Sequence, residues 1–149
     1  MVFVDSNVFI IDRFYPRDAL YSQNRSFVEK LPFLDTAISI LTLLEVCGGA
    51  SHRLSAGELD DWLLWFDTIY PVHVIDAHGI SQKDAEAWWR DFVREVTAAI
   101  AKKMSFGDAL LLREAENYNA EAIVTWNTKD FARRTRLTVL TPIGFLRQH

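Results

Sequence analysis

Short apolar runs alternate with longer amphipathic segments along this chain. The short runs predict buried strands, at residues 1–4, 35–40, 71–75, 122–125 and 137–140. Between them, apolar residues recur at helical spacing. They predict helices over residues 8–14, 19–31 and 105–118, and a helix that starts at residue 42 and breaks at Gly48-Gly49. Two more helices are predicted, one that begins after Ser55 and one that begins after Asp76 or Ser81. The run 126–130 is expected to be a loop, 131–134 a helical turn, and Pro142 the start of a closing turn or helix.

The order of these elements predicts the fold class. Short apolar strands separated by helices are typical of a parallel sheet covered on both faces, with right-handed crossovers. No linker, repeat or low-complexity stretch divides the chain. We therefore expect one domain over residues 1–149, a three-layer α/β/α sandwich with a central parallel sheet.

Composition narrows the class of protein. The chain has 149 residues, of which 50% are hydrophobic, and a formal net charge of −4, so net charge gives no support for nucleic-acid binding. Cys47 is the only cysteine, which excludes an intramolecular disulfide. No basic segment precedes the first strand, and no apolar run is long enough for a bilayer. We expect a cytoplasmic protein without a membrane segment.

Four acids stand out because each lies at or near the start of a predicted helix: Asp5, Glu45, Asp108 and Asp130. One interpretation is structural. Asp5 follows a strand, Thr42-x-x-Glu45 and Ser105-x-x-Asp108 have the capping-box form, and Asp130 precedes the turn at Phe131, so every one of them could be a helix cap.

The alternative interpretation is a metal site. Helices that follow parallel strands start at the carboxyl edge of the sheet, where Asp5, Glu45 and Asp130 would gather. Clustered carboxylates repel one another unless a cation neutralises them, and Mg²⁺ and Mn²⁺ prefer oxygen ligands. The chain has no zinc spacing and no glycine-rich phosphate loop.

Taken together, these motifs resemble a known family. Asp5 in VFVDSN, Glu45 in LTLLEV, Asp108 in SFGDALL and the run VTWNTKDF resemble, in order and spacing, the PIN domain, and most closely the VapC-type ribonuclease toxins of toxin–antitoxin pairs. The resemblance covers nearly the whole chain. It implies a Mg²⁺- or Mn²⁺-dependent endoribonuclease in which Asp5, Glu45 and Asp108 are catalytic metal ligands, a cognate antitoxin as partner, and a homodimer.

The fourth acidic position departs from the family pattern. Many relatives carry Asp two residues after the Thr that corresponds to Thr125, where this chain has Asn127. Asp130 is then the candidate fourth catalytic residue, as a ligand or a residue behind the ligands. Asn127, Thr125 and Asn7 are expected to support the site.

Two surfaces are candidates for contact with RNA or protein partners. The basic residues Lys129, Arg133, Arg134 and Arg136 surround Asp130 and could meet RNA phosphates. Trp62 and Trp88 fit the apolar helix faces, whereas Trp65 and Trp89 fit them less well and could line a groove for a partner helix or a dimer interface.

Three other functions remain open. The chain could be an RNA-processing nuclease outside a toxin–antitoxin pair, or a non-catalytic binding module with a PIN-like fold. A phosphatase of the haloacid-dehalogenase type is disfavoured, because that family needs a second Asp where Asn7 stands.

Overall fold

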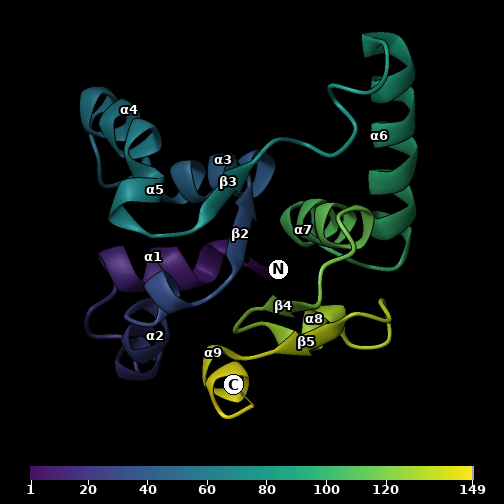
Figure 1. The fold of residues 1–149 in the computed structure, drawn as a ribbon. Helices are drawn as coiled ribbons and strands as arrows, with labels where there is room; N and C mark the ends of the chain where they lie inside the picture. The colour runs from purple at the N-terminus through teal and green to yellow at the C-terminus, as the bar shows by residue number, and fades with distance from the viewer. Residues whose placement is uncertain (149) are drawn as a thin grey trace.

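All strands of the sheet run parallel. The structure is a computed structural model that describes residues 1–148, and its sheet has the order β3-β2-β1-β4-β5 (Figure 1). The strands are β1 (Val2–Val4), β2 (Thr36–Ser39), β3 (His73–Ile75), β4 (Ala122–Val124) and β5 (Thr138–Leu140). Strand β1 is central, with Phe3 in register with Ala37 on one side and Ile123 on the other. The predicted sandwich with a central parallel sheet is confirmed.

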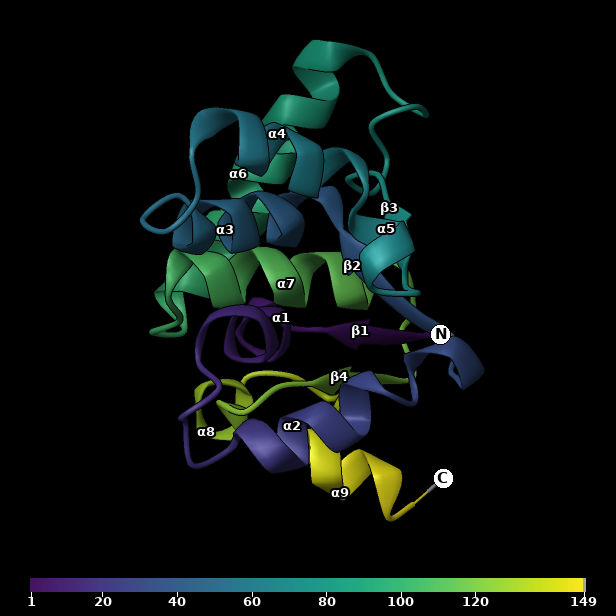
Figure 2. The same ribbon diagram turned by 90° about the vertical axis from the view of Figure 1, so that its left-hand side faces the viewer.

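Helices make the connections between the strands. They are α1 (Ser6–Phe14), α2 (Tyr21–Val28), the 3-10 helix η1 (Leu31–Phe33), α3 (Ile40–Ala50), α4 (Ala56–Leu64), α5 (Phe66–Ile69), α6 (Ala85–Ala101), α7 (Phe106–Asn117), α8 (Thr128–Phe131) and α9 (Pro142–Leu146). Helix α3 packs against both α1 and α7 (Figure 2). None of the helices in residues 1–148 combines the length and the apolar composition needed to cross a bilayer.

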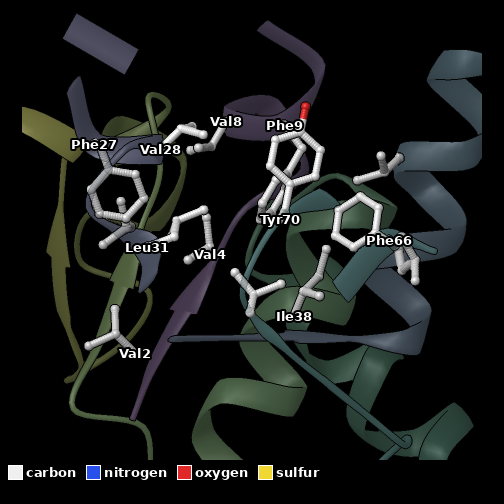
Figure 3. Packing of buried hydrophobic residues seen from close by; sticks show 14 of the residues in the cluster. Val2, Val4, Val8, Phe9, Phe27, Val28, Leu31, Ile38, Phe66 and Tyr70 are labelled. Atoms are coloured by element: carbon white, nitrogen blue, oxygen red, sulfur yellow. The ribbon is translucent and has the colours of Figure 1, made fainter. Parts of the chain in front are cut away.

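The side chains of β1 alternate between two hydrophobic cores. Val2 and Val4 face a cluster shared with α1, α2, α3 and α5, in which Phe9, Phe66 and Tyr70 lie together (Figure 3). Phe3 faces the opposite cluster, built with α6 and α7. Residues of both cores are buried, as expected for a parallel sheet with helices on each face.

Helix α3 corrects one prediction. It begins at Ile40, after the Ser39 cap, and continues through Gly48-Gly49 to Ala50. The glycines do not break it because Gly49 lies against α1. A Cβ at Gly49 would be 2.9 Å from Ile10 Cδ1, so the residue permits the close packing of two helices instead of ending one.

Four other boundaries differ from the predictions. Helix α1 begins at Ser6, and α2 ends at Val28, because Pro32 lies inside η1. Helix α6 is capped by Asp84, whose carboxylate accepts from Ala87 N–H, and not by Asp76 or Ser81. The helical turn expected at 131–134 lies three residues earlier, as α8, inside the expected loop. Local turn signals in the sequence therefore predict the ends of these helices only approximately.

The tryptophans divide as expected. Trp62 is buried and Trp88 is half-buried, whereas Trp65 and Trp89 are 56% and 59% exposed. The two exposed rings stay candidates for a partner contact.

Candidate functional site

Asp5 lies at the carboxyl end of the central strand. It follows β1 directly and occupies the N-cap position of α1, yet its carboxylate makes no capping hydrogen bond. The carboxylate instead accepts from side chains: Asn7 Nδ2 and Thr125 Oγ1, each 2.6 Å from Oδ2, and Ser6 Oγ, 3.2 Å from Oδ1. The capping interpretation is therefore wrong for the side chain of Asp5, which is 95% buried and bonded to three neighbouring side chains.

The predicted supporting residues join in one network. Asn7 Nδ2 also lies 3.0 Å from Thr125 Oγ1, which in turn accepts from the backbone N–H of Asn127 at 2.9 Å. Thr125 is fully buried. Asn7 and Thr125 thus hold Asp5 directly, and the contact of Asn127 with this network is made by its backbone.

Glu45 approaches Asp5 from α3. Its place is one turn inside the helix, because Ser39 and not Thr42 is the cap, so the capping interpretation is wrong here as well. The carboxylate packs against the backbone of Gly107 at the start of α7. A Cβ on Gly107 would lie 2.0 Å from Glu45 Oε1, so only glycine leaves room for this carboxylate.

Asp108 completes the group from the first turn of α7. The capping interpretation is correct here for Ser105, whose Oγ accepts from the Asp108 N–H at 3.2 Å. The Asp108 carboxylate does not complete a capping box, because its Oδ2 accepts from the Ser105 hydroxyl at 2.7 Å and not from the Ser105 backbone. In residues 1–148 the other carboxylate oxygen of Asp108 accepts no hydrogen bond, and it is available for a ligand. A helix N-terminus also favours negative charge, on the carboxylate or on a bound phosphate.

The three acids repel one another. Burial raises the pKa of the Asp5 carboxyl, and repulsion from Asp108 adds to this, while the hydrogen bond from Thr125 opposes it. Burial and then repulsion from Asp5 raise the pKa of Glu45, and its contact with the Ser6 hydroxyl lowers it. None of the ion pairs within residues 1–148 includes any of the three. Among the described residues, no cation of the protein forms an ion pair with this cluster of negative charge.

The type of these ligands suits a hard divalent cation, although in this arrangement the three carboxylates are not close enough to bind one ion together. Carboxylate oxygens without a neutralising base are the ligands that Mg²⁺ and Mn²⁺ take. Across residues 1–148, however, no three His, Cys, Asp or Glu side chains lie close enough to hold one ion jointly. Asp5, Glu45 and Asp108 would hold a cation only after a rotation of side chains, such as release of Asp108 from Ser105.

Asp130 is not brought into this group. It lies half-buried in α8, one turn beyond Asn127, and does not cap a helix. Its backbone carbonyl accepts from the Arg134 guanidinium, and in the described residues no contact joins its carboxylate to the three acids. Lys129 and Arg133 are exposed beside it, and Arg134 is half-buried.

Three residues of the site were missed by the sequence analysis. Ser6 contacts both Asp5 and Glu45, and Gly107 makes room for Glu45. Asn24, buried in α2, donates to the Val8 carbonyl at 2.8 Å and accepts from Trp126 Nε1 at 2.8 Å, which ties the loop after β4 to α1. The glycine between a Ser cap and an acid was a usable signal for Gly107, whereas nothing local marked Asn24.

Solved structures share this arrangement of elements. A chain of a toxin–antitoxin complex from Klebsiella pneumoniae superimposes with a TM-score of 0.62 and 25% identity, covering 95% of this chain and 98% of that one. Toxin–antitoxin complexes contain this fold. VapBC2 from Rickettsia felis, bound to a promoter DNA fragment, gives a TM-score of 0.60 at 21% identity, over 93% of this chain and 97% of that one. FitAcB from Neisseria gonorrhoeae gives a TM-score of 0.61 at 16% identity, over 95% of this chain and 98% of that one.

The likeness is one of structure. No family model and no curated protein matches the sequence. At such low identity the superpositions establish a shared PIN-like fold along nearly the full length of both chains, and any role of the acids must be argued from their geometry.

Proposed function

We propose that this protein is the toxin of a toxin–antitoxin pair and acts as a metal-dependent endoribonuclease. The observation that carries the proposal is the un-neutralised cluster of Asp5, Glu45 and Asp108 at the carboxyl edge of the sheet. The fold shared with chains of toxin–antitoxin complexes supports the same assignment.

The three clustered acids share one role in this proposal, and their neighbours position them. Asp5, Glu45 and Asp108 would hold Mg²⁺ or Mn²⁺. Once bound, such an ion lowers the pKa of a coordinated water and shields the charge that develops on the phosphoryl group. Thr125 and Asn7 fix the orientation of Asp5, and Gly107 lets Glu45 reach the site. Asp130 is assigned a place behind the ligands, because its carboxylate does not reach them in the described residues.

The partners follow from the same proposal. An antitoxin would cover the acidic edge, and the exposed Trp65 and Trp89 are candidate contacts for it or for a second copy of the chain. The substrate is RNA, whose phosphates the basic residues near Asp130 would meet.

Cleavage of a structured RNA tests the proposal. We expect Mg²⁺ or Mn²⁺ to support cleavage by the wild type, EDTA to abolish it, and Asp5→Asn or Asp108→Asn to reduce it at least about 100-fold, as the loss of a metal ligand does. Asp84→Asn is the matched control, because Asn caps a helix as well as Asp and Asp84 lies outside the site.

The alternatives give different results. Cleavage that survives EDTA, or survives both substitutions, contradicts the metal mechanism. No Mn²⁺ binding in a titration, with no effect of Asp5→Asn, indicates a non-catalytic module. Metal-dependent cleavage that no protein encoded by the neighbouring reading frame inhibits indicates a processing nuclease instead of a toxin.

A further inference from the structure

Two turns that are distant in the sequence are joined by a hydrogen bond. One ends α6 and holds Lys102 and Lys103; the other follows α8 and holds Arg133, Arg134 and Arg136. Lys102 Nζ donates to the Arg134 carbonyl at 3.2 Å, and the Arg134 guanidinium donates to the Asp130 carbonyl. Together with Lys129 on α8, these six residues form what we call the two-turn basic surface.

The cations of this surface are not neutralised by acids of the described residues. None of the six takes part in an ion pair within the described residues, although the chain is acidic overall, with 20 acids against 16 lysines and arginines. Two acids lie nearby. Glu116 accepts from the Thr135 hydroxyl at 2.8 Å, and Asp130 lies on α8, yet neither carboxylate is paired with one of these cations. The positive charge is therefore available to an anion from outside.

Two of these cations occupy backbone positions where glycine would be more favourable for folding. Lys103 has φ of +66° and Arg133 has φ of +65°, the left-handed region in which a Cβ is unfavourable and glycine is preferred. The only other non-glycine residue of positive φ in residues 1–148 is Asn119, a type that tolerates it. Lys103 and Arg133 are exposed, so burial does not account for either side chain. Strain that a glycine would relieve points to a role in binding.

The surface lies next to the proposed site. Lys103 is two residues before the Ser105 cap of α7, whose first turn carries Asp108, and Arg134 is bonded to α8, which begins directly after Asn127. A nucleic-acid strand crossing the acidic edge would pass its neighbouring phosphates over these turns.

We propose that the two-turn basic surface binds the phosphates of the RNA strand beside the scissile bond, with Lys102 joining the α6–α7 turn to the 129–136 segment as one unit. That the bound strand is RNA rests on the proposed nuclease function. It extends the predicted RNA contacts at Lys129, Arg133 and Arg134 to Lys102 and Lys103, which only the tertiary structure places beside them.

The test uses glycine, which removes the charge and relieves the backbone at once. In Lys103→Gly with Arg133→Gly, we expect the thermal midpoint to stay unchanged or rise, while affinity for a short fluorescent single-stranded RNA falls. Measured in EDTA at several salt concentrations, the slope of log K against log[salt] should decrease by about 1.4, since each single-strand phosphate contact contributes about 0.7.

Asn119→Gly is the matched control, because it relieves the same kind of backbone without changing charge, and it should leave the slope unaltered. An unchanged slope in the double variant overturns the inference even where metal-dependent cleavage is intact. A reduced slope upholds it as an RNA-binding surface even where cleavage proves independent of metal, so this test and the test of the proposed function fail separately.

Discussion

The first turns of α4 and α7 carry the same sequence pattern and have different surroundings. Ser55-Ala-Gly-Glu58 and Ser105-Phe-Gly-Asp108 both place a serine at the cap, a glycine at the second helical position and an acid at the third. In both, the serine hydroxyl accepts from the backbone N–H of the acid and lies 2.7 Å from its carboxylate. One bond differs, because Glu58 also accepts from the Ser55 backbone N–H at 2.8 Å and completes a capping box, whereas in the described residues Asp108 accepts only from the Ser105 hydroxyl.

The difference lies in what packs against each turn. Apart from the helix backbone and the two neighbouring residues, no atom of residues 1–148 comes within 4 Å of a Cβ built on Gly57, and Ser55 and Glu58 face solvent. Gly107 instead lies under the Glu45 carboxylate, and Asp108 raises the pKa of both Asp5 and Glu45 by repulsion. The pKa of Glu58, in contrast, is lowered by its hydrogen bonds from the Ser55 backbone and side chain. The motif in α4 is a cap only, and the motif in α7 is a cap that also carries an acid of the proposed site.

Alanine at the two glycines should give the largest difference. In Gly107→Ala, the new methyl group displaces the flexible Glu45 carboxylate, so we expect Mn²⁺ affinity and RNA cleavage to fall about 10- to 100-fold, as for other residues that orient metal ligands. Stability should change little, because alanine favours the helix.

Gly57→Ala is the matched control at the same helical position. It should raise stability slightly and leave cleavage unchanged. Equal cleavage by the two alanine variants would contradict a role for Glu45 at the site.

Neutralising Glu45 should stabilise the metal-free protein by a small amount, whereas alanine at Gly107 should leave its stability almost unchanged. Because the pKa of Glu45 is raised, its charge is unfavourable in the folded protein, and Glu45→Gln should raise the metal-free melting temperature at pH 7 by a few degrees, at about 2–4 °C per kcal/mol for a domain of this size. Added Mn²⁺ should stabilise the wild type more than the variant. A variant that melts below the wild type without metal would contradict the assigned repulsion.

Glu58→Gln should give the smallest effect, visible as a dependence on pH. The pKa of Glu58 is lowered in the folded protein, so its ionised form stabilises the fold above the ordinary pKa of 4.5, and this stabilisation is lost as the pH falls through the lowered pKa. Urea unfolding of wild type and Glu58→Gln should therefore differ at pH 6 and converge in acid. A difference that grows towards low pH would have the wrong sign for this cap.

Much of the fold is determined by local patterns in the sequence. Five apolar runs placed the five strands, and the spacing of apolar residues placed the long helices, because a parallel sheet buries both faces of its strands and each helix buries one. The same order of elements predicts that Asp5 lies at the carboxyl edge of the sheet. Helix ends were less predictable, as Gly48-Gly49 shows, since a glycine signals a break locally and permits a close contact between helices globally.

What the sequence could not decide is which acids meet. Asp5, Glu45, Asp108 and Asp130 had equal claims to be caps, and the same pattern recurs at Glu58. The packing of α3 against α7 brings Glu45 over Gly107. Other tertiary contacts leave Asp130 apart on α8 and join Lys102, at the end of α6, to a turn 32 residues away. The reason is physical. Capping is fixed within one helical turn, whereas repulsion between carboxylates and their lack of a neutralising base depend on chain segments that only the tertiary fold brings together.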